Sequence, residues 1–156
     1  MLPERLSNGI CSLNAGEDRL TMSCEMHIDR KGRILSYEIF PSVIHVRHRL
    51  SYRIVREILV NGDEGLAQKY EDVVPMLKMM EELCLVLRKK RTTRGAIDFD
   101  LPEQKVILDE QGRPVEIVQR IRSIAESIIE EFMLAANETV ARHMSVSYTH
   151  LTLPTT

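Results

Sequence analysis

The sequence predicts an α+β fold in which antiparallel strands and hairpins pack with three helices. Residues 20–28 alternate apolar and polar side chains, as a half-buried strand does. Residues 72–91 carry apolar side chains three and four positions apart, which is the spacing of one helix face. Turn-forming residues at 29–32 and 110–114 separate pairs of strand-like runs and indicate hairpins. A chain of 156 residues is long enough for one domain with a core.

The composition is that of an ordinary soluble protein. It argues against a globally basic nucleic-acid-binding protein and against a membrane-spanning protein. The net charge of -2 provides no global basic field, so any attraction to nucleic acid must be local. No apolar run approaches the ~20 residues of a membrane-spanning helix, and the first residues lack a signal-peptide layout. The three cysteines show no CxxC spacing, and an odd number without a secretion signal fits a reducing compartment. We therefore expect a cytoplasmic protein that does not contact membranes.

The N-terminal third is expected to contain a loop and a strand pair. Residues 1–17 read as an ordered loop, because Pro and Asn-Gly residues interrupt regular structure there. The following strand should bury its alternating apolar set, Leu20, Met22, Cys24, Met26 and Ile28. After the turn, a returning strand is expected over 34–46, where Pro41 predicts an edge strand or a break.

Two helices are expected in the middle of the chain. Ser51 should cap a short helix over 52–60, which Asn61-Gly62 ends. A long helix follows over about 72–91 and ends in four basic residues that complement its negative dipole. Its core seam is predicted to be Val73, Leu77, Met80, Cys84 and Leu87, and Met76 and Met79 are also expected to lie in the core.

A second hairpin and a last helix complete the predicted fold. The hairpin strands are expected over 105–109 and 115–119. The last helix is expected over about 123–143, because Ser123 and Glu126 form a capping box at its start. Residues 145–156 have neither helical period nor charge, and we expect them to be a non-native tail outside the domain of residues 1–144.

The block from Arg94 to Glu103 is the first candidate for chemistry. In an extended segment Phe99 points to one side and its neighbours Asp98 and Asp100 point to the other. The two carboxylates could ligate Mg²⁺, or they could be solvated acids that pair with the basic residues before them. Phe99 could stack on a nucleic-acid base, or it could be a core residue. Residue spacing alone leaves these alternatives open.

Two polar clusters are further candidates. Residues 45–49 combine two histidines with two arginines, which suits a phosphate-contacting loop or a solvated face, and lacks a third ligand for zinc. Glu130 lies one turn after Glu126 on the last helix and has no cation three or four positions further on. Its partner is therefore expected to be a tertiary contact, a ligand or water.

Four blocks of the sequence are specific enough to compare with known families. The first is MLPERLSNGICSLN at the start of the chain. The others are PSVI from Pro41 with RLSY ending at Tyr52, RGAIDFDLPE around Phe99, and IAESIIEEFMLAAN around Glu130. These blocks resemble the catalytic, or RNB, domain of the ribonuclease R and ribonuclease II exoribonucleases, and the bacterial ribonuclease R branch most of all. Their order and spacing agree with that family from residue 1 to about 144.

The resemblance implies processive 3′→5′ hydrolysis of single-stranded RNA to nucleoside 5′-monophosphates, assisted by Mg²⁺, in a monomeric parent enzyme. It implies that Phe99 stacks on terminal bases and that Tyr52 and Glu130 recognise ribose. This role would suit the chemistry of Glu130, because a carboxylate without a cation can accept a hydrogen bond from a neutral hydroxyl group. Asp98 and Asp100 then become structural acids.

The same resemblance implies that this chain is an internal fragment. The family's metal-binding aspartates precede the segment matched by residue 1, and its catalytic arginine motif follows the segment matched by His143. We therefore expect neither catalytic nor metal-binding residues in this chain, and no hydrolysis by the chain alone. The alternative is a small α+β interaction module that presents the long helix, with its Met and Leu side chains, to a protein partner.

Overall fold

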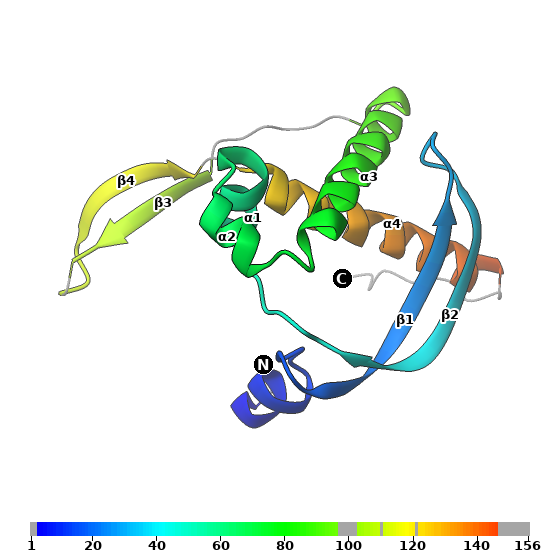
Figure 1. Cartoon of the computed structure of the whole chain (residues 1–156), viewed down its shortest axis with the longest axis horizontal. Coiled ribbons are helices and arrows are strands. Elements are labelled where there is room, and N and C mark those ends of the chain that lie inside the picture. The colour runs from blue at the N-terminus through cyan, green and yellow to red at the C-terminus, as the bar shows by residue number, and fades with distance from the viewer. Residues whose placement is uncertain (1–2, 97–102, 110, 121, 147–156) are drawn as a thin grey trace, which may run out of the picture.

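The computed structural model describes residues 3–96, 103–109, 111–120 and 122–146, and Figure 1 shows how their helices and strands are arranged. The α+β fold expected from the sequence is confirmed. In chain order the elements are η1 Leu6–Ile10, β1 Asp18–Ile28, β2 Ile34–His45, α1 Tyr52–Arg56, η2 Glu57–Asn61, α2 Glu64–Lys69, α3 Val74–Thr93, β3 Glu103–Leu108, β4 Pro114–Arg120 and α4 Ile124–Val146.

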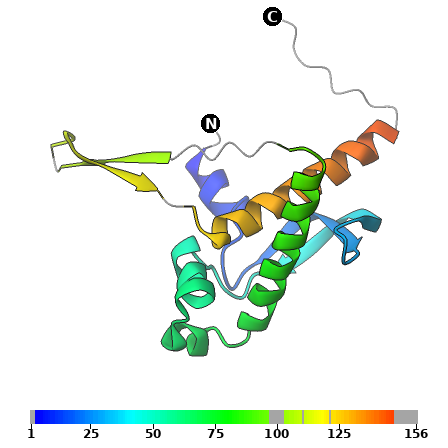
Figure 2. The same ribbon diagram turned by 90° about the horizontal axis from the view of Figure 1, so that it is seen from above.

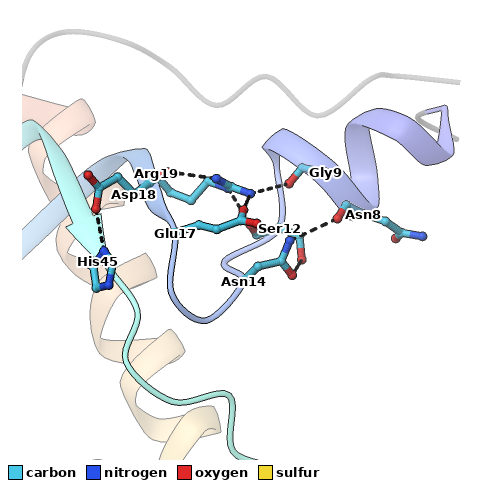
Figure 3. Close-up of polar contacts among 8 residues, drawn as sticks. All are labelled: Asn8, Gly9, Ser12, Asn14, Glu17, Asp18, Arg19 and His45. Atoms are coloured by element: carbon cyan, nitrogen blue, oxygen red, sulfur yellow. Dashed lines mark hydrogen bonds and ion pairs between the residues drawn. The ribbon is translucent and has the colours of Figure 1, made fainter.

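The N-terminal segment was expected to be a loop, and part of it is helical. The carbonyl of Pro3 accepts bonds from the N–H groups of Leu6 and Ser7 at 2.9 and 3.0 Å, which starts a short π-helical turn. Arg19 of β1 then holds the following loop, because its Nε donates to the Ser12 carbonyl at 3.0 Å and its Nη2 lies 3.5 Å from the Gly9 carbonyl. Figure 3 shows this guanidinium reaching back from the strand into the loop.

β1 and β2 form the expected antiparallel hairpin, a two-stranded ribbon with Pro41 opposite Met22. Because neither strand has a second neighbour among the described elements, both are edge strands, and the missing N–H of Pro41 breaks no inner ladder.

The ribbon buries only part of the predicted apolar set. Leu20 and Met22 are 86% and 72% exposed, so the expectation that both lie inward is wrong. In that half of the ribbon the half-buried side carries Thr21, Ser23 and Ser42, whose hydroxyls bond one another at 2.6–2.8 Å. The physical reason is that the helices cover the ribbon only nearer its turn, where Met26 meets Thr139 of α4 at 3.2 Å.

The short helices near residue 60 follow their caps. The Ser51 hydroxyl accepts from the Ile54 N–H at 3.4 Å, as expected, and Gly62 ends η2 in the left-handed region with φ +67°. A further helix, α2, is capped by Asp63, whose carboxylate accepts from the Leu66 N–H at 2.9 Å. No helix was predicted at α2, although an N-cap aspartate was visible in the sequence.

The core lies where α3 crosses α4, with η2 packed against α3 and α1 packed against α4. Leu77, Cys84 and Leu87 of the predicted seam are buried, Val73 and Met80 are half-buried, and Ile128 of α4 is also buried. Met76 and Met79 were expected in the core, but they are 47% and 64% exposed. The reason is that both lie outside the face of α3 that the seam defines.

The second hairpin, β3–β4, is also confirmed, and it projects away from the helices (Figure 2). The Glu126 half of the predicted capping box is present at the start of α4, because the Glu126 carboxylate accepts from the Ser123 N–H at 3.0 Å, and the Ser123 hydroxyl bonds the same carboxylate. α4 continues to Val146, so it includes the first two residues of the expected tail, and residues 147–156 lie outside the described residues. Among the described residues, no helix is long and apolar enough to span a membrane.

Candidate functional site

Tyr52 is the first residue of α1, directly after the Ser51 cap, and 45% of its surface is exposed. The capped first turn fixes the backbone that carries the Tyr52 side chain, and the phenol hydroxyl can donate or accept a hydrogen bond. Because α1 packs against α4, the helix that carries Tyr52 contacts the helix that carries Glu130. The two side chains make no hydrogen bond with each other in the described part of the chain.

Glu130 lies on the first half of α4 with 43% of its side chain exposed. Its carboxylate is 3.9 Å from Nη2 of Arg91 on α3 and 3.8 Å from Nη1 of Arg122, just before α4. Of the three partners left open by the sequence, a tertiary contact is present, and the argument that Glu130 lacks a cation is wrong. The sequence argument considered only the positions three and four residues after Glu130 on the same helix. Arg91 lies on another helix, and Arg122 precedes α4, so neither was considered.

The adjacent Glu131 is the best-buried acid of the described chain, at 4% exposure. Nη2 of Arg91 lies 2.7 Å from its carboxylate, within charge-assisted hydrogen-bond distance. Arg91 therefore neutralises Glu131 closely and Glu130 from a longer distance. This pair was missed, although the sequence contained a signal: Glu131 shares the apolar face of Ile128 and Ala135, where a charge requires a buried partner.

Cys84 packs beside this ion pair with none of its surface exposed. Burial, and then the negative charge of Glu131, raise the pKa of its thiol above the ordinary value. A thiol that is both inaccessible and difficult to ionise is no nucleophile, so Cys84 serves the core.

A second interhelical pair lies one turn along α3, where Arg94 reaches Glu138 of α4 at 2.8 Å. A cavity of about 40 Å³ lies between the two pairs, bounded on one side by Ile34 and Leu87. It is large enough for a few water molecules but not for a nucleotide. The ion-pair layer between α3 and α4 is therefore structural, with Glu131 buried, and Glu130 and Glu138 at its margins keep exposed side-chain surface.

The histidines of residues 45–49 are paired with acids rather than with each other. Nδ1 of His45 lies 2.6 Å from Asp18, and Nε2 of His48 lies 2.9 Å from Asp72. The His48 hydrogen bond holds the pKa of Asp72 below its ordinary value. These contacts reduce the free positive charge of the segment and weaken its interpretation as a phosphate-contacting loop.

Phe99 and its flanking acids Asp98 and Asp100 lie outside the described residues. Among the residues that are described, no group of three or more His, Cys, Asp or Glu side chains could hold a metal ion. The described side chains thus do not fit a magnesium centre.

Comparison with known proteins decides the family. The model of the RNB domain matches residues 1–155. The chain belongs to the RNB domain family. It is 54% identical over 142 residues to ribonuclease R of Thermotoga maritima and 50% identical over 143 residues to ribonuclease R 1 of Lactococcus lactis. These matches cover 90% and 92% of this chain but only 20% and 17% of the two relatives.

The fold agrees with solved ribonuclease R structures. Mycoplasma genitalium ribonuclease R in complex with ribose-methylated single-stranded RNA superposes with a TM-score of 0.85 at 34% identity, over 94% of this chain and 22% of that one. The same enzyme in complex with double-stranded RNA gives a TM-score of 0.84. The RNB chain therefore corresponds to about a fifth of the length of these relatives, and the predicted resemblance to the ribonuclease R branch is confirmed.

Proposed function

We propose that this RNB chain is the RNA-holding part of a processive 3′→5′ exoribonuclease that degrades single-stranded RNA to nucleoside 5′-monophosphates. Family membership supports this proposal, and so does the chemistry of Tyr52 and Glu130 on two helices that pack together. A rival reading as a protein-interaction module on α3 has no comparable support, because its relatives are ribonucleases R.

The observation that carries the proposal is the position of the Glu130 carboxylate. Distances of 3.8 and 3.9 Å to two guanidinium groups exceed hydrogen-bond length, so the arginines attract the carboxylate without occupying its lone pairs. An ionised carboxylate has about four acceptor sites. It can therefore accept a hydrogen bond from a ribose hydroxyl, while Tyr52 supplies a second polar group from α1.

Within this proposal Phe99 stacks on the terminal bases, a contact worth about 1–3 kcal/mol per base. The 2′-hydroxyl is the group that distinguishes RNA from DNA at such a site. Magnesium would act in the parent enzyme, but the described residues do not fit a magnesium centre, so this chain is assigned no metal-dependent step. We expect the chain alone to bind RNA without cleaving it.

The test compares two oligonucleotides that differ only in the 2′-hydroxyl, U16 and dU16, each with a 5′-fluorescein label. We expect the unaltered chain to prefer U16, and Tyr52→Phe and Glu130→Gln to reduce that preference about fivefold each, the effect of one hydrogen bond of about 1 kcal/mol. Glu82→Gln on the exposed side of α3 is the matched control. Equal affinity of the unaltered chain for U16 and dU16 would contradict ribose recognition.

A second measurement tests inactivity. The chain is incubated with labelled U16 and Mg²⁺, and the products are separated on a denaturing gel. We expect intact RNA. Cleavage that disappears in Phe99→Ala would show that the chain contains the catalytic groups itself, and would overturn this part of the proposal.

A further inference from the structure

The basic run that ends α3 is divided between different partners. Arg91 faces α4 and pairs with Glu131 at 2.7 Å. Lys90 points to the β1–β2 turn, where its Nζ donates to the Gly32 carbonyl at 2.8 Å. Lys89 is exposed and has no side-chain partner among the described residues. Since 100° separates successive helix residues, Lys89 lies about 200° away from Arg91, on a different face of α3.

Lys89 lines a groove between the end of α3 and the β1–β2 turn. Figure 1 shows this turn beside the C-terminal part of the helix. The groove has a volume of about 600 Å³, and Val86 and Thr93 line it together with five cationic side chains. The cations are Arg30, Lys31, Lys89, Lys90 and Arg94. None of the residues that line this groove is acidic, although the chain as a whole carries a net charge of -2.

The two walls of the groove are fixed against each other. Gly32 is buried, and a Cβ added to it would lie 3.3 Å from both Val86 Cγ1 and Lys90 Cδ. Together with the bond from Lys90, this close packing holds Arg30 and Lys31 across from Lys89. The cations are therefore presented by a rigid junction of two elements rather than by a mobile end.

The nearby acid of the turn does not neutralise the groove. Asp29 binds Nε of Arg33 and the backbone N–H groups of Arg33 and Lys31, all at 2.8–2.9 Å. Compensation of the helix dipole would explain basic residues on the last turn of α3. It does not explain Arg30 and Lys31, which belong to the hairpin.

We propose that this groove binds the phosphate backbone of an RNA strand, as a second contact on a different face of α3 from Arg91. This inference rests on the proposed function, because it takes RNA as the occupant. Arg94 already pairs with Glu138, and Lys90 donates to the Gly32 carbonyl, so the cations left to recognise phosphate oxygens are Arg30, Lys31 and Lys89. The volume is that of a nucleotide-sized ligand rather than of a single phosphate ion. No aromatic side chain lines the groove, so the contact is to the backbone and is the same for RNA and DNA.

The experiment uses the full chain and the U16 and dU16 probes, titrated between 25 and 200 mM KCl. The groove variant combines Arg30→Ala, Lys31→Ala and Lys89→Ala, and leaves Lys90 intact so that the hairpin stays on α3. The control variant removes equal charge elsewhere, through Lys69→Ala, Lys78→Ala and Arg113→Ala. Thermal unfolding followed by circular dichroism verifies that both variants are folded.

Each phosphate contact to a single strand contributes about 0.7 to the slope of log K against log salt, so the groove variant should lose about 2 units of slope. We expect the same loss for U16 and dU16, and no loss in the control. An unchanged slope in the groove variant, or no binding of U16 by the unaltered chain at 25 mM KCl, would overturn the proposal. The proposal would also be overturned if the groove bound inorganic phosphate, detected by ³¹P NMR, while the groove variant bound U16 as tightly as the unaltered chain.

The two proposals fail in different ways. Loss of ribose recognition appears as an equal affinity for U16 and dU16, whatever the salt slope. Failure of the groove alone appears as an unchanged salt slope in the groove variant, whatever the ratio of the two affinities, whereas a complete absence of U16 binding overturns both proposals.

Discussion

At the scale of single residues, Arg91 has the most consequential set of contacts. It satisfies an almost fully buried carboxylate, Glu131, and also lies near Glu130, the candidate ribose acceptor. An ion pair of this kind adds little net stability compared with apolar residues, yet removing one partner is costly because a buried charge is left behind. Arg91 therefore links the stability of the α3–α4 interface to the position of the candidate site.

We predict that Arg91→Ala lowers the free energy of unfolding by about 3 kcal/mol, the low end of the range for breaking a buried pair, because Arg91 is itself partly exposed. Urea unfolding followed by circular dichroism measures the loss. Arg94→Ala is the control, since the pair of Arg94 with Glu138 is exposed and should contribute less than about 1 kcal/mol. Equal losses in the two variants would show that the Arg91 pair is not effectively buried.

The pH dependence of stability also follows from single residues. The Arg94 hydrogen bond holds the pKa of Glu138 below its ordinary value of 4.5, and the backbone and guanidinium of Arg33 hold the pKa of Asp29 below 3.8. Because both carboxyls bind protons more weakly in the folded state, their stabilising effect is complete above those ordinary values and is lost as pH falls through the folded values.

The urea midpoint should therefore fall as the pH is lowered from 5 to 3. Glu138→Gln removes one of the titrating groups and should make that fall shallower. A midpoint that falls just as steeply in Glu138→Gln would mean that this pair does not contribute.

At the scale of elements, local signals predicted most of what formed. Ser51 and the Ser123–Glu126 box fixed helix starts, because a cap acts within three residues of itself. The pairing of Arg91 with Glu131 could not be predicted in the same way, since it joins residues forty positions apart. The exposure of Met76 and Met79 was missed for a related reason: a seam is visible in sequence, but its width depends on what packs against it.

The contact between the first hairpin and α3 gives a sharp prediction at this scale. Gly32→Ala places a methyl group 3.3 Å from Val86 Cγ1, in a backbone with φ +74°. Val86 is β-branched and stiff, and Lys90 is held by its bond to the Gly32 carbonyl, so neither neighbour yields easily. An alanine in the left-handed conformation costs about 1–2 kcal/mol of the free energy of unfolding. We expect Gly32→Ala to cost about 1 kcal/mol in addition, because its methyl group also crowds Val86 and Lys90.

Gly62→Ala is the matched control, because Gly62 has φ +67° and open space around its Cβ position. Both variants lose the glycine freedom, and only Gly32→Ala crowds the helix. Urea unfolding of the two variants should therefore differ by that additional cost. Identical losses would mean that the hairpin yields without resistance, and that the walls of the cationic groove are not fixed.

At the scale of the whole molecule, several large apolar side chains of the described residues remain exposed, Leu20, Met22 and Val43 among them. The family was predictable because its sequence blocks are specific. The exposure of Leu20 and Met22 was not, because alternation shows which side chains share a face and not whether another element covers that face.

The uncovered face leads to a prediction about association. Leu20 lies opposite Val43, and Met22 lies opposite Pro41, so these side chains form one apolar strip on a ribbon whose two edges pair with no other described strand. We expect the chain to self-associate as its concentration rises, and Leu20→Thr with Met22→Thr to shift it toward monomer in sedimentation velocity. Leu35→Thr, which removes another exposed leucine outside the strip, should change little. A chain that remains monomeric at about 200 µM would show that the strip is too small to drive association, since contiguous apolar patches become adhesive only above a few hundred Å².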